Sequence, residues 1–259
     1  MIANYHTHTP LCRHASGEMR EYVEEAIRRG LKILGFADHS PYVFPEKWGY
    51  YSNFRMFPKD TEGYVRTLRD LKREYARDID IKIGFEAEYY PDLFEDFLAF
   101  LRPYDVDYLI MGQHFVGNEY GEKYNGWDSP DEERLTRYVS QVLEGLDTGK
   151  FSYLAHPDLL HFTGEEAVLR REFSRLARGI AERGIPGEIN LLGIRSHRHY
   201  PNPIFWEEAS RVGGVTAILG CDAHEPESVT DPSSEAKARE WARKWGIPIL
   251  ESLSLKKPL

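Results

Sequence analysis

The chain has 259 residues, a length that suits one large domain or two small ones, and α/β barrels are commonly of this size. Hydrophobic residues make up 41% and charged residues 29%, which is typical of a folded globular protein and argues against a disordered one. The formal net charge of −9 argues against non-specific binding of DNA or RNA, because nucleic-acid phosphates require basic partners. A small anionic substrate stays compatible with that charge, since bound metal cations can reverse the sign of the local field.

The cysteine content and the hydropathy of the chain indicate the cellular compartment of the protein. The two cysteines, Cys12 and Cys221, indicate no disulfide framework and fit a reducing environment. The N-terminus becomes polar within four residues and carries no apolar signal core. No apolar run approaches the ~18 residues of a transmembrane span. The sequence therefore predicts a cytoplasmic protein that does not enter a membrane, and it leaves the oligomeric state open.

Patterns typical of strands and helices alternate along most of the chain. The expected strands are the N-terminal segment around His6 and His8 and the ranges 32–39, 79–89, 108–115, 153–156, 187–192, 215–221 and 247–250. The expected helices are 18–30, 64–75, 92–101, 131–147, 165–183, 203–212 and 233–245. Strands separated by helices imply a parallel sheet, and a closed α/β barrel over residues 1–259 is the preferred single-domain arrangement. A doubly wound open sheet is the alternative, but no Gly-x-Gly-x-x-Gly turn supports it.

An aromatic loop at about residues 41–58 interrupts the alternation. Its aromatic residues are Tyr42, Phe44, Trp48, Tyr50, Tyr51, Phe54 and Phe57. The loop is longer and more aromatic than an ordinary connection between a strand and a helix. It is either a surface loop fixed by its own aromatic rings or a wall over a ligand pocket. As a wall, it would enclose the organic end of a substrate, and Trp48 is the residue chosen to test that role.

Histidines and carboxylates recur where the expected strands end. These residues are His6, His8, His14, His39, Glu86, His114, His156, Asp222 and His224. Barrel enzymes build their sites from the carboxyl ends of their strands. Imidazoles and carboxylates together suit zinc, iron or manganese, and the lack of cysteine clusters argues against a structural zinc finger. Nine ligands exceed what one ion can take, so the sequence predicts two or three divalent ions, a site able to hold a bridging hydroxide and to clamp a phosphoryl group.

These residues and their neighbours resemble, in order and spacing, the motifs of the PHP (polymerase and histidinol phosphatase) superfamily. The resemblance runs from residue 6 to residue 224, and its details look like the monofunctional histidinol-phosphate phosphatase branch. The motifs are His6-Thr7-His8-Thr9-Pro10-Leu11-Cys12 with His14, Ala37-Asp38-His39-Ser40, Gly84-Phe85-Glu86-Ala87-Glu88, Glu188-x-Asn190-x-x-Gly193-x-Arg195 with Tyr200-Pro201, and Gly220-Cys221-Asp222-Ala223-His224.

The resemblance implies a distorted (β/α)7 barrel with a trinuclear metal site. Its ligand sets would be His6, His8, Glu86 and Asp222 for one ion, Glu86, His114 and His156 for a second, and His14, His39 and His224 for a third. Asp38 would either orient a ligand from outside the coordination sphere or stabilise a turn. Glu88 lies on the same strand face as Glu86 and could compete as the bridging carboxylate, but the motif position favours Glu86.

Arg195 is the residue expected to bind a substrate phosphate, through a bidentate contact that lysine could not imitate. It belongs to the segment 194–200, which is unusually basic for so acidic a chain. His197 and Arg198 are further candidates for substrate binding, and a solvated loop is the alternative interpretation of this segment. Glu86, Asp222 and Arg195 are the residues expected to act in catalysis.

The resemblance implies hydrolysis of L-histidinol phosphate to L-histidinol and phosphate in histidine biosynthesis, by in-line attack of a metal-bridging hydroxide. Another PHP-type phosphoesterase, acting on a different small ester or a nucleotide, is the nearest alternative. A metal-dependent amidohydrolase is less favoured, because no lysine lies at an expected strand end to serve as a carbamylated bridge. A non-catalytic barrel would not need the intact ligand set. The expected partner is therefore a small phosphorylated metabolite and neither a nucleic acid nor a membrane.

Overall fold

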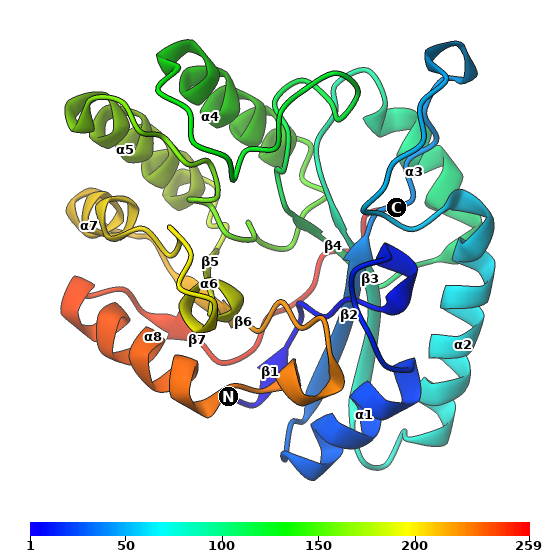
Figure 1. The fold of residues 1–259 in the computed structure, drawn as a ribbon. Coiled ribbons are helices and arrows are strands. Elements are labelled where there is room, and N and C mark those ends of the chain that lie inside the picture. The colour runs from blue at the N-terminus through cyan, green and yellow to red at the C-terminus, as the bar shows by residue number, and fades with distance from the viewer.

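A computed structural model describes all 259 residues of the chain as a parallel α/β fold. Seven strands lie near the centre, and the longer helices surround them (Figure 1). The strands are β1 (Ala3–Asn4), β2 (Ile33–His39), β3 (Asp80–Ala87), β4 (Tyr108–Met111), β5 (Gly187–Asn190), β6 (Ala217–Gly220) and β7 (Ile249–Leu250). They form two parallel sheets, ordered β1-β2-β3-β4 and β5-β6-β7.

Isolated parallel bridges join these two sheets into a curled wall. Leu154 pairs with Met111 of β4 on one side and with Gly187 of β5 on the other, while Thr7 pairs with Ala223 just after β6. The expected strand at 153–156 is therefore reduced to single bridges at Leu154. The wall is a distorted α/β barrel in one domain, which confirms the fold class predicted from the sequence and excludes the open doubly wound sheet.

The first strand is shorter than expected because the Asn4 side chain replaces part of the backbone ladder. Its Oδ1 accepts hydrogen bonds from the backbone N–H groups of His6 and Cys221, both at 3.1 Å. The chain stays extended beyond this point, since His8 N donates to Ala223 O at 2.9 Å. The rings of His6 and His8 lie 5.1 Å apart and share one face, as the alternation of side chains along an extended segment predicts.

Eight α-helices accompany the strands. They are α1 (Met19–Arg28), α2 (Thr61–Glu74), α3 (Phe94–Leu101), α4 (Glu132–Asp147), α5 (Glu166–Glu182), α6 (Leu191–Arg195), α7 (Pro203–Val212) and α8 (Pro232–Trp245). All but the short α6 were expected. Side-chain caps fix several of their starts: Asp131 accepts from Arg134 N, and Asn202 precedes a proline and accepts from Ile204 N. Asn190 caps α6 by accepting from Gly193 N, so β5 passes directly into a helix at the rim.

The apolar core has two parts. A cluster of 60 buried residues lies between the helices and the outer face of the strands, and a separate cluster of eight fills the barrel interior. The interior cluster consists of Ala3, Tyr5, Ala37, Tyr108, Ile110, Tyr153, Ala155 and Ile218. The C-terminal segment packs against it through Leu253 and Leu255, and Leu253 N donates to the Tyr5 hydroxyl at 3.2 Å. One end of the barrel is thereby closed.

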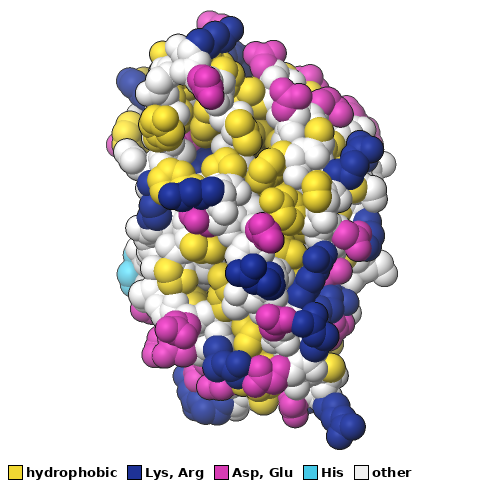
Figure 2. Space-filling view, turned by 90° about the vertical axis from the view of Figure 1, so that its right-hand side faces the viewer, with side chains coloured by type: hydrophobic (Ala, Val, Ile, Leu, Met, Phe, Trp, Pro, Cys, Tyr) yellow, Lys and Arg dark blue, Asp and Glu magenta, His cyan; other side chains and the backbone are white.

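Charged side chains of both signs are interspersed over the face shown in Figure 2, so the acidic excess is not gathered there. Ion pairs join neighbouring helices, for example Arg20 of α1 with Glu74 of α2 at 2.6 Å. Such exposed pairs contribute little to stability, because water and salt screen the attraction between the charges. No helix combines the length and apolar character needed to cross a lipid bilayer.

Gly84 of β3 allows close packing inside this wall. A Cβ there would lie 2.5 Å from the backbone oxygen of Tyr108 and 2.6 Å from its ring. Gly84→Ala is therefore expected to cost about 1–3 kcal/mol, because a backbone neighbour cannot move aside. Gly63→Ala in α2, where a Cβ meets open space, is the control and is expected to add about 0.5–1 kcal/mol. Urea unfolding of both variants measures the difference, and equal stabilities would contradict this packing.

Candidate metal centre

The nine residues predicted at the strand ends come together at the open rim of the barrel. Seven of them line a cavity of about 570 Å³, namely His14, His39, Glu86, His114, His156, Asp222 and His224. His6 and His8 lie fully buried against the same carboxylates, at the base of the site. The remaining lining residues are Asn53, Phe54, Phe115, Tyr124, Leu159, Leu192, Arg198 and Tyr200.

The Glu86 carboxylate of β3 is the centre of the cluster. Its Oε2 lies 3.0 Å from His39 Nδ1, 3.5 Å from His6 Nε2 and 3.6 Å from His8 Nε2. On the other side, Oε1 lies 2.8 Å from His156 Nε2 and 3.5 Å from His114 Nε2. One carboxylate thus faces five imidazoles from four separate segments of the chain. The space for it depends on Gly112, where any Cβ would overlap the carboxylate.

Asp222 supplies a second carboxylate on the opposite side of His8. Its Oδ1 lies 3.2 Å from His8 Nε2, 3.4 Å from His224 Nδ1 and 3.7 Å from His6 Nε2. Asp222 directly follows β6 and Cys221, with a positive φ of 47° that turns the chain toward the rim. His6 and His8 therefore face both carboxylates, one from each side of the barrel.

The spacing and burial of these atoms fit metal ions. Two donors at about 2.1 Å from one tetrahedral ion lie roughly 3.4 Å apart, which is close to the separations found here. Several buried atoms of the cluster have no hydrogen-bond partner, an arrangement that is costly unless an ion satisfies them. These atoms are His6 Nε2, His8 Nδ1 and Nε2, His39 Nδ1, Glu86 Oε2, His156 Nδ1 and His224 Nε2. Glu86 with His6 and His8, and Asp222 with His6 and His156, form groups compact enough for one ion each.

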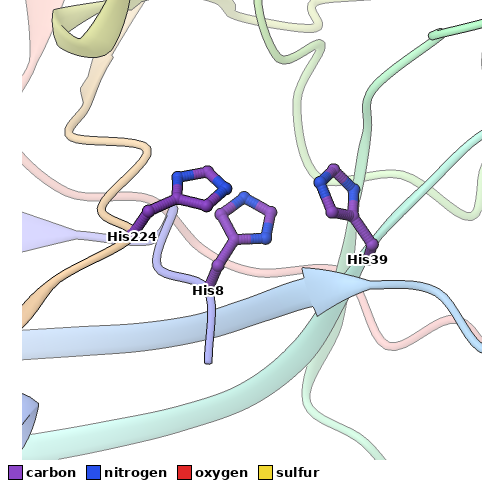
Figure 3. Close-up of side chains that lie close together, drawn as sticks. All are labelled: His8, His39 and His224. Carbon is purple, nitrogen blue, oxygen red and sulfur yellow. The ribbon is translucent and has the colours of Figure 1, made fainter. Parts of the chain in front are cut away.

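Figure 3 shows a third compact group, His8, His39 and His224. The rings of His8 and His224 stack at 4.2 Å, and His39 lies 4.4 Å from His8. The resemblance groups His14, in place of His8, with His39 and His224. The ring of His14 lies 4.8 Å from that of His224 and 5.2 Å from that of His39. Its Nδ1 hydrogen-bonds to Cys12 O at 2.9 Å, which leaves Nε2 for an ion.

The electrostatics of the cluster keep its carboxylates ionised and divide its imidazoles into two groups. Burial disfavours the charged forms of all these groups, but the nearby imidazoles hold the pKa values of Glu86 and Asp222 well below their usual range. Burial and the charge of His8 lower the pKa of His224 to about 3 and that of His39 well below its usual value. Burial lowers the pKa values of His6, His8 and His156 too, but the carboxylates beside them outweigh it and raise the pKa of His8 to about 9 and that of His6 well above its usual value. These imidazoles therefore have to release a proton when they bind an ion, since only neutral imidazoles act as ligands.

Glu188 of β5 is a site residue to which sequence reasoning gave no role, although it stands in the quoted Glu188-x-Asn190 motif. It is fully buried and accepts hydrogen bonds from His6 Nδ1 at 2.7 Å, from His156 N at 3.1 Å and from Asn190 Nδ2 at 2.9 Å. The bond to His6 Nδ1 leaves Nε2 directed at the two central carboxylates. Glu188 therefore fixes the orientation of a candidate ligand from outside the cluster.

Asp38 and Glu88 also contact the candidate ligands from outside the cluster. Asp38 accepts from Thr9 N at 3.2 Å and from His39 N at 2.8 Å, and its Oδ1 lies 3.6 Å from His8 Nδ1. It therefore holds the loop after β1 against β2. Glu88 accepts from His114 Nδ1 at 2.8 Å and faces away from Glu86, so it does not compete as the bridging carboxylate.

The basic segment is arranged differently from the expectation. The Arg195 guanidinium donates to the backbone oxygens of Cys221 at 2.7 Å and Asp222 at 2.9 Å, and it does not line the cavity. Arg195 thus supports the chain that carries Asp222, and the structure does not place it at a substrate phosphate. His197 is exposed and borders a separate surface hollow. Arg198 reaches the cavity and donates to the Tyr200 hydroxyl at 2.9 Å.

Only part of the aromatic loop reaches the cavity. Asn53 and Phe54 line it, whereas the Trp48 ring stacks on that of Tyr120 at 4.9 Å and is not among the lining residues. The choice of Trp48 as the residue enclosing a substrate is therefore wrong, because this ring fastens two loops to each other. Sequence alone could not separate the two roles, since every ring in the loop carries the same apolar signal.

A parallel α/β barrel with a buried histidine–carboxylate cluster at the carboxyl ends of its strands defines the class of metal-binding barrel proteins. The PHP domain family matches residues 4–191, which is most of the chain. This chain belongs to the PHP family.

Relatives and solved structures agree with that membership. The chain is 30% identical over 240 residues to a probable histidinol-phosphatase from Deinococcus radiodurans, with 88% of each chain covered. It is 30% identical over 252 residues to a histidinol-phosphatase from Bacillus subtilis, with 85% of this chain and 92% of the relative covered. Histidinol phosphate phosphatase from Lactococcus lactis, solved with zinc, L-histidinol and phosphate, has a TM-score of 0.75 at 23% identity over 97% of this chain and 96% of its own. That structural likeness supports the fold.

The buried carboxyl group of Asp158, two residues after His156, makes the stability of the fold depend on pH. It is buried, accepts a hydrogen bond from Asn202 N, and has an unpartnered Oδ1. Burial raises its pKa to about 7, whereas the unfolded chain ionises near pH 4. Between about pH 4 and pH 7 the folded protein therefore binds the extra proton, and stability falls as the pH rises, by on the order of 3–4 kcal/mol.

Asp158→Asn keeps an oxygen for Asn202 N and removes the ionisation. The stability advantage of this variant over the natural chain is expected to grow from pH 5 to pH 8. Urea unfolding of both metal-depleted proteins at these pH values measures it. A difference that stays constant with pH contradicts the assignment.

Proposed function

We propose that this protein is a metal-dependent phosphomonoesterase that hydrolyses L-histidinol phosphate to L-histidinol and phosphate, a reaction of histidine biosynthesis. The observation that carries the proposal is the cluster of nine histidines and carboxylates around Glu86, opening into a cavity that also presents Arg198. The substrate follows from the relatives of similar length, two of which are named as histidinol-phosphatases or probable ones.

The nine residues would hold two or three divalent ions of zinc, iron or manganese. In this assignment Glu86 would be a ligand of two ions, together with Asp222, His6 and His8 for one and with His114 and His156 for the other. His14, His39 and His224 would hold the third. When bound, the ions supply Lewis acidity toward the phosphoryl oxygens and acidify water. Oligomeric state and location in the cell have no part in this assignment.

Arg198 is the residue that we assign to the substrate phosphate, in place of Arg195. Its side chain lines the same cavity as the cluster, where the guanidinium would bind phosphate oxygens and stabilise the charge that develops on them. Tyr124 and Tyr200 flank it, and burial raises the pKa of Tyr124 to about 12 and that of Tyr200 well above its usual value. Both hydroxyls therefore stay protonated near neutral pH and can donate hydrogen bonds to the phosphate or to the leaving oxygen.

The organic end of the substrate would lie against the apolar wall of the cavity. Phe54 of the aromatic loop and Phe115 after β4 supply two rings there, 5.5 Å apart, and Leu159 and Leu192 are further apolar residues of the lining. Asn53 is the neutral polar group on that side and can hydrogen-bond an imidazole or an amino group. An aromatic wall with a single amide suits a flat heteroaromatic ring better than a sugar.

A phosphate-release assay over a panel of monoesters tests the proposed reaction, with metal content measured on the same sample. Histidinol phosphate is expected to be among the best substrates. Chelation is expected to abolish turnover, and added Zn²⁺, Mn²⁺ or Fe²⁺ to restore it. If histidinol phosphate is a poor substrate while other monoesters are cleaved, the substrate assignment fails and a different PHP phosphoesterase activity remains. No release from any monoester after metal loading contradicts the phosphatase assignment.

Replacing Arg198 tests its assignment to the phosphate. Arg198→Gln is expected to lower kcat/KM about 10- to 100-fold, because a hydrogen bond to a charged group contributes about 1.5–3 kcal/mol. His197→Gln is the matched control, since the neighbouring side chain does not line the cavity, and it is expected to stay within about twofold. Steady-state kinetics on both variants decide the point. Equal effects of the two substitutions contradict a specific role for Arg198.

A further inference from the structure

A buried arginine, Arg55, connects the aromatic loop to the barrel through hydrogen bonds beside the candidate metal centre. Arg55 is only 1% exposed, and every nitrogen of its guanidinium has a partner. Nε donates to Glu119 Oε2 at 2.7 Å, Nη1 to Ser40 O at 2.9 Å and to Glu88 Oε2 at 3.1 Å, and Nη2 to Glu88 Oε1 at 3.0 Å. Arg55 therefore binds two buried carboxylates, one on β3's continuation and one on the loop after β4.

The two carboxylates differ in what else they contact. Glu119 accepts only from groups of the surrounding loops, namely Arg55 and the Tyr50 hydroxyl. Glu88 Oε1 is shared between Arg55 Nη2 and His114 Nδ1, at 3.0 and 2.8 Å. The opposite nitrogen of that ring, His114 Nε2, is the one directed at Glu86 Oε1. A continuous chain of contacts thus runs from the loop through Glu88 to a candidate ligand.

We propose that Glu88 is a positioning residue for His114, and that Arg55 holds it in place from the aromatic loop. This inference rests on the proposed ligation of a metal by His114 and does not depend on the substrate. A carboxylate can only accept, so the Glu88 contact keeps the proton of His114 on Nδ1 and leaves the Nε2 lone pair free for an ion. The bidentate contact with Arg55 fixes the plane of the carboxylate and, through it, the orientation of the ring.

The same geometry explains why a glutamine in place of Glu88 would not position His114. Glu88 uses both oxygens as acceptors, Oε2 toward Arg55 and the Ser40 hydroxyl and Oε1 toward Arg55 and His114. A glutamine offers one oxygen and one NH2 group. With its oxygen in the place of Oε1, its NH2 faces Arg55 Nη1 and the bidentate contact is lost. With its oxygen in the place of Oε2, its NH2 faces both Arg55 Nη2 and His114 Nδ1, which must then become an acceptor and move the ring proton to Nε2. That tautomer cannot bind a metal through Nε2.

Glu88→Gln and Glu119→Gln form a matched pair for the test, because each neutralises one buried carboxylate bound to Arg55. The probe is Co²⁺ added to the metal-depleted full-length protein, with affinity from titration and ligand geometry from the visible absorption spectrum. Glu88→Gln is expected to weaken the affinity of the affected Co²⁺ site about 10- to 100-fold and to change its spectrum. Glu119→Gln is expected to lower the unfolding temperature as Glu88→Gln does, while keeping Co²⁺ affinity within about threefold.

The outcomes separate this inference from the proposed function. Unchanged Co²⁺ affinity and spectrum in Glu88→Gln overturn the positioning role alone, and so do equal losses in Glu88→Gln and Glu119→Gln. A natural protein that binds no Co²⁺ overturns the proposed function and this inference together. If circular dichroism shows that Glu88→Gln does not fold, Glu88→Asp takes its place. The aspartate keeps the charge for Arg55 but is too short to reach both partners, so the same loss of Co²⁺ affinity is expected.

Discussion

The structure depends above all on one buried carboxylate, Glu86, surrounded by five imidazoles. A carboxylate that is 1% exposed is costly to hold in its charged form unless nearby groups compensate for the lost water. Here the imidazoles lie at or beyond the ends of β1, β2 and β4 and beyond the bridge at Leu154. They therefore surround Glu86 only when the barrel is closed. Assembly of the cluster and closure of the barrel are therefore one event, and the unpartnered nitrogens at its centre mark where cations complete the charge balance.

A ring of further carboxylates surrounds the central one and fixes its partners. Glu188 accepts from His6, Glu88 accepts from His114, and Asp38 lies against His8 and the start of the following loop. The hydrogen bonds of Glu188 and Glu88 fall on the imidazole nitrogen that is turned away from the centre. The outer acceptors determine which nitrogen carries a proton and so which one is free for an ion. The acidic composition of the chain is partly explained by this need.

The loop insertion and the barrel are parts of one site. Phe54 and Asn53 form a wall of the cavity, while Arg55, the next residue, is buried against Glu88 behind a candidate ligand. The ring of Trp48, in the aromatic loop, stacks on that of Tyr120, in the segment after β4. The loop thereby contributes to the cavity and to the support of the cluster at once, which gives a physical reason for an insertion so long and so aromatic.

The sequence by itself determined the parallel α/β barrel and the nine residues at its rim, because both follow from local rules: alternation along extended segments, and the meeting of strand ends at one edge. It could not determine what lies behind those residues. Glu188 and Arg55 act through partners more than 30 positions away, and Arg195 turns from the cavity because two backbone oxygens after β6 take its guanidinium. Only the tertiary structure brings such groups together, since hydrogen-bond geometry depends on distances in space that no spacing along the chain encodes.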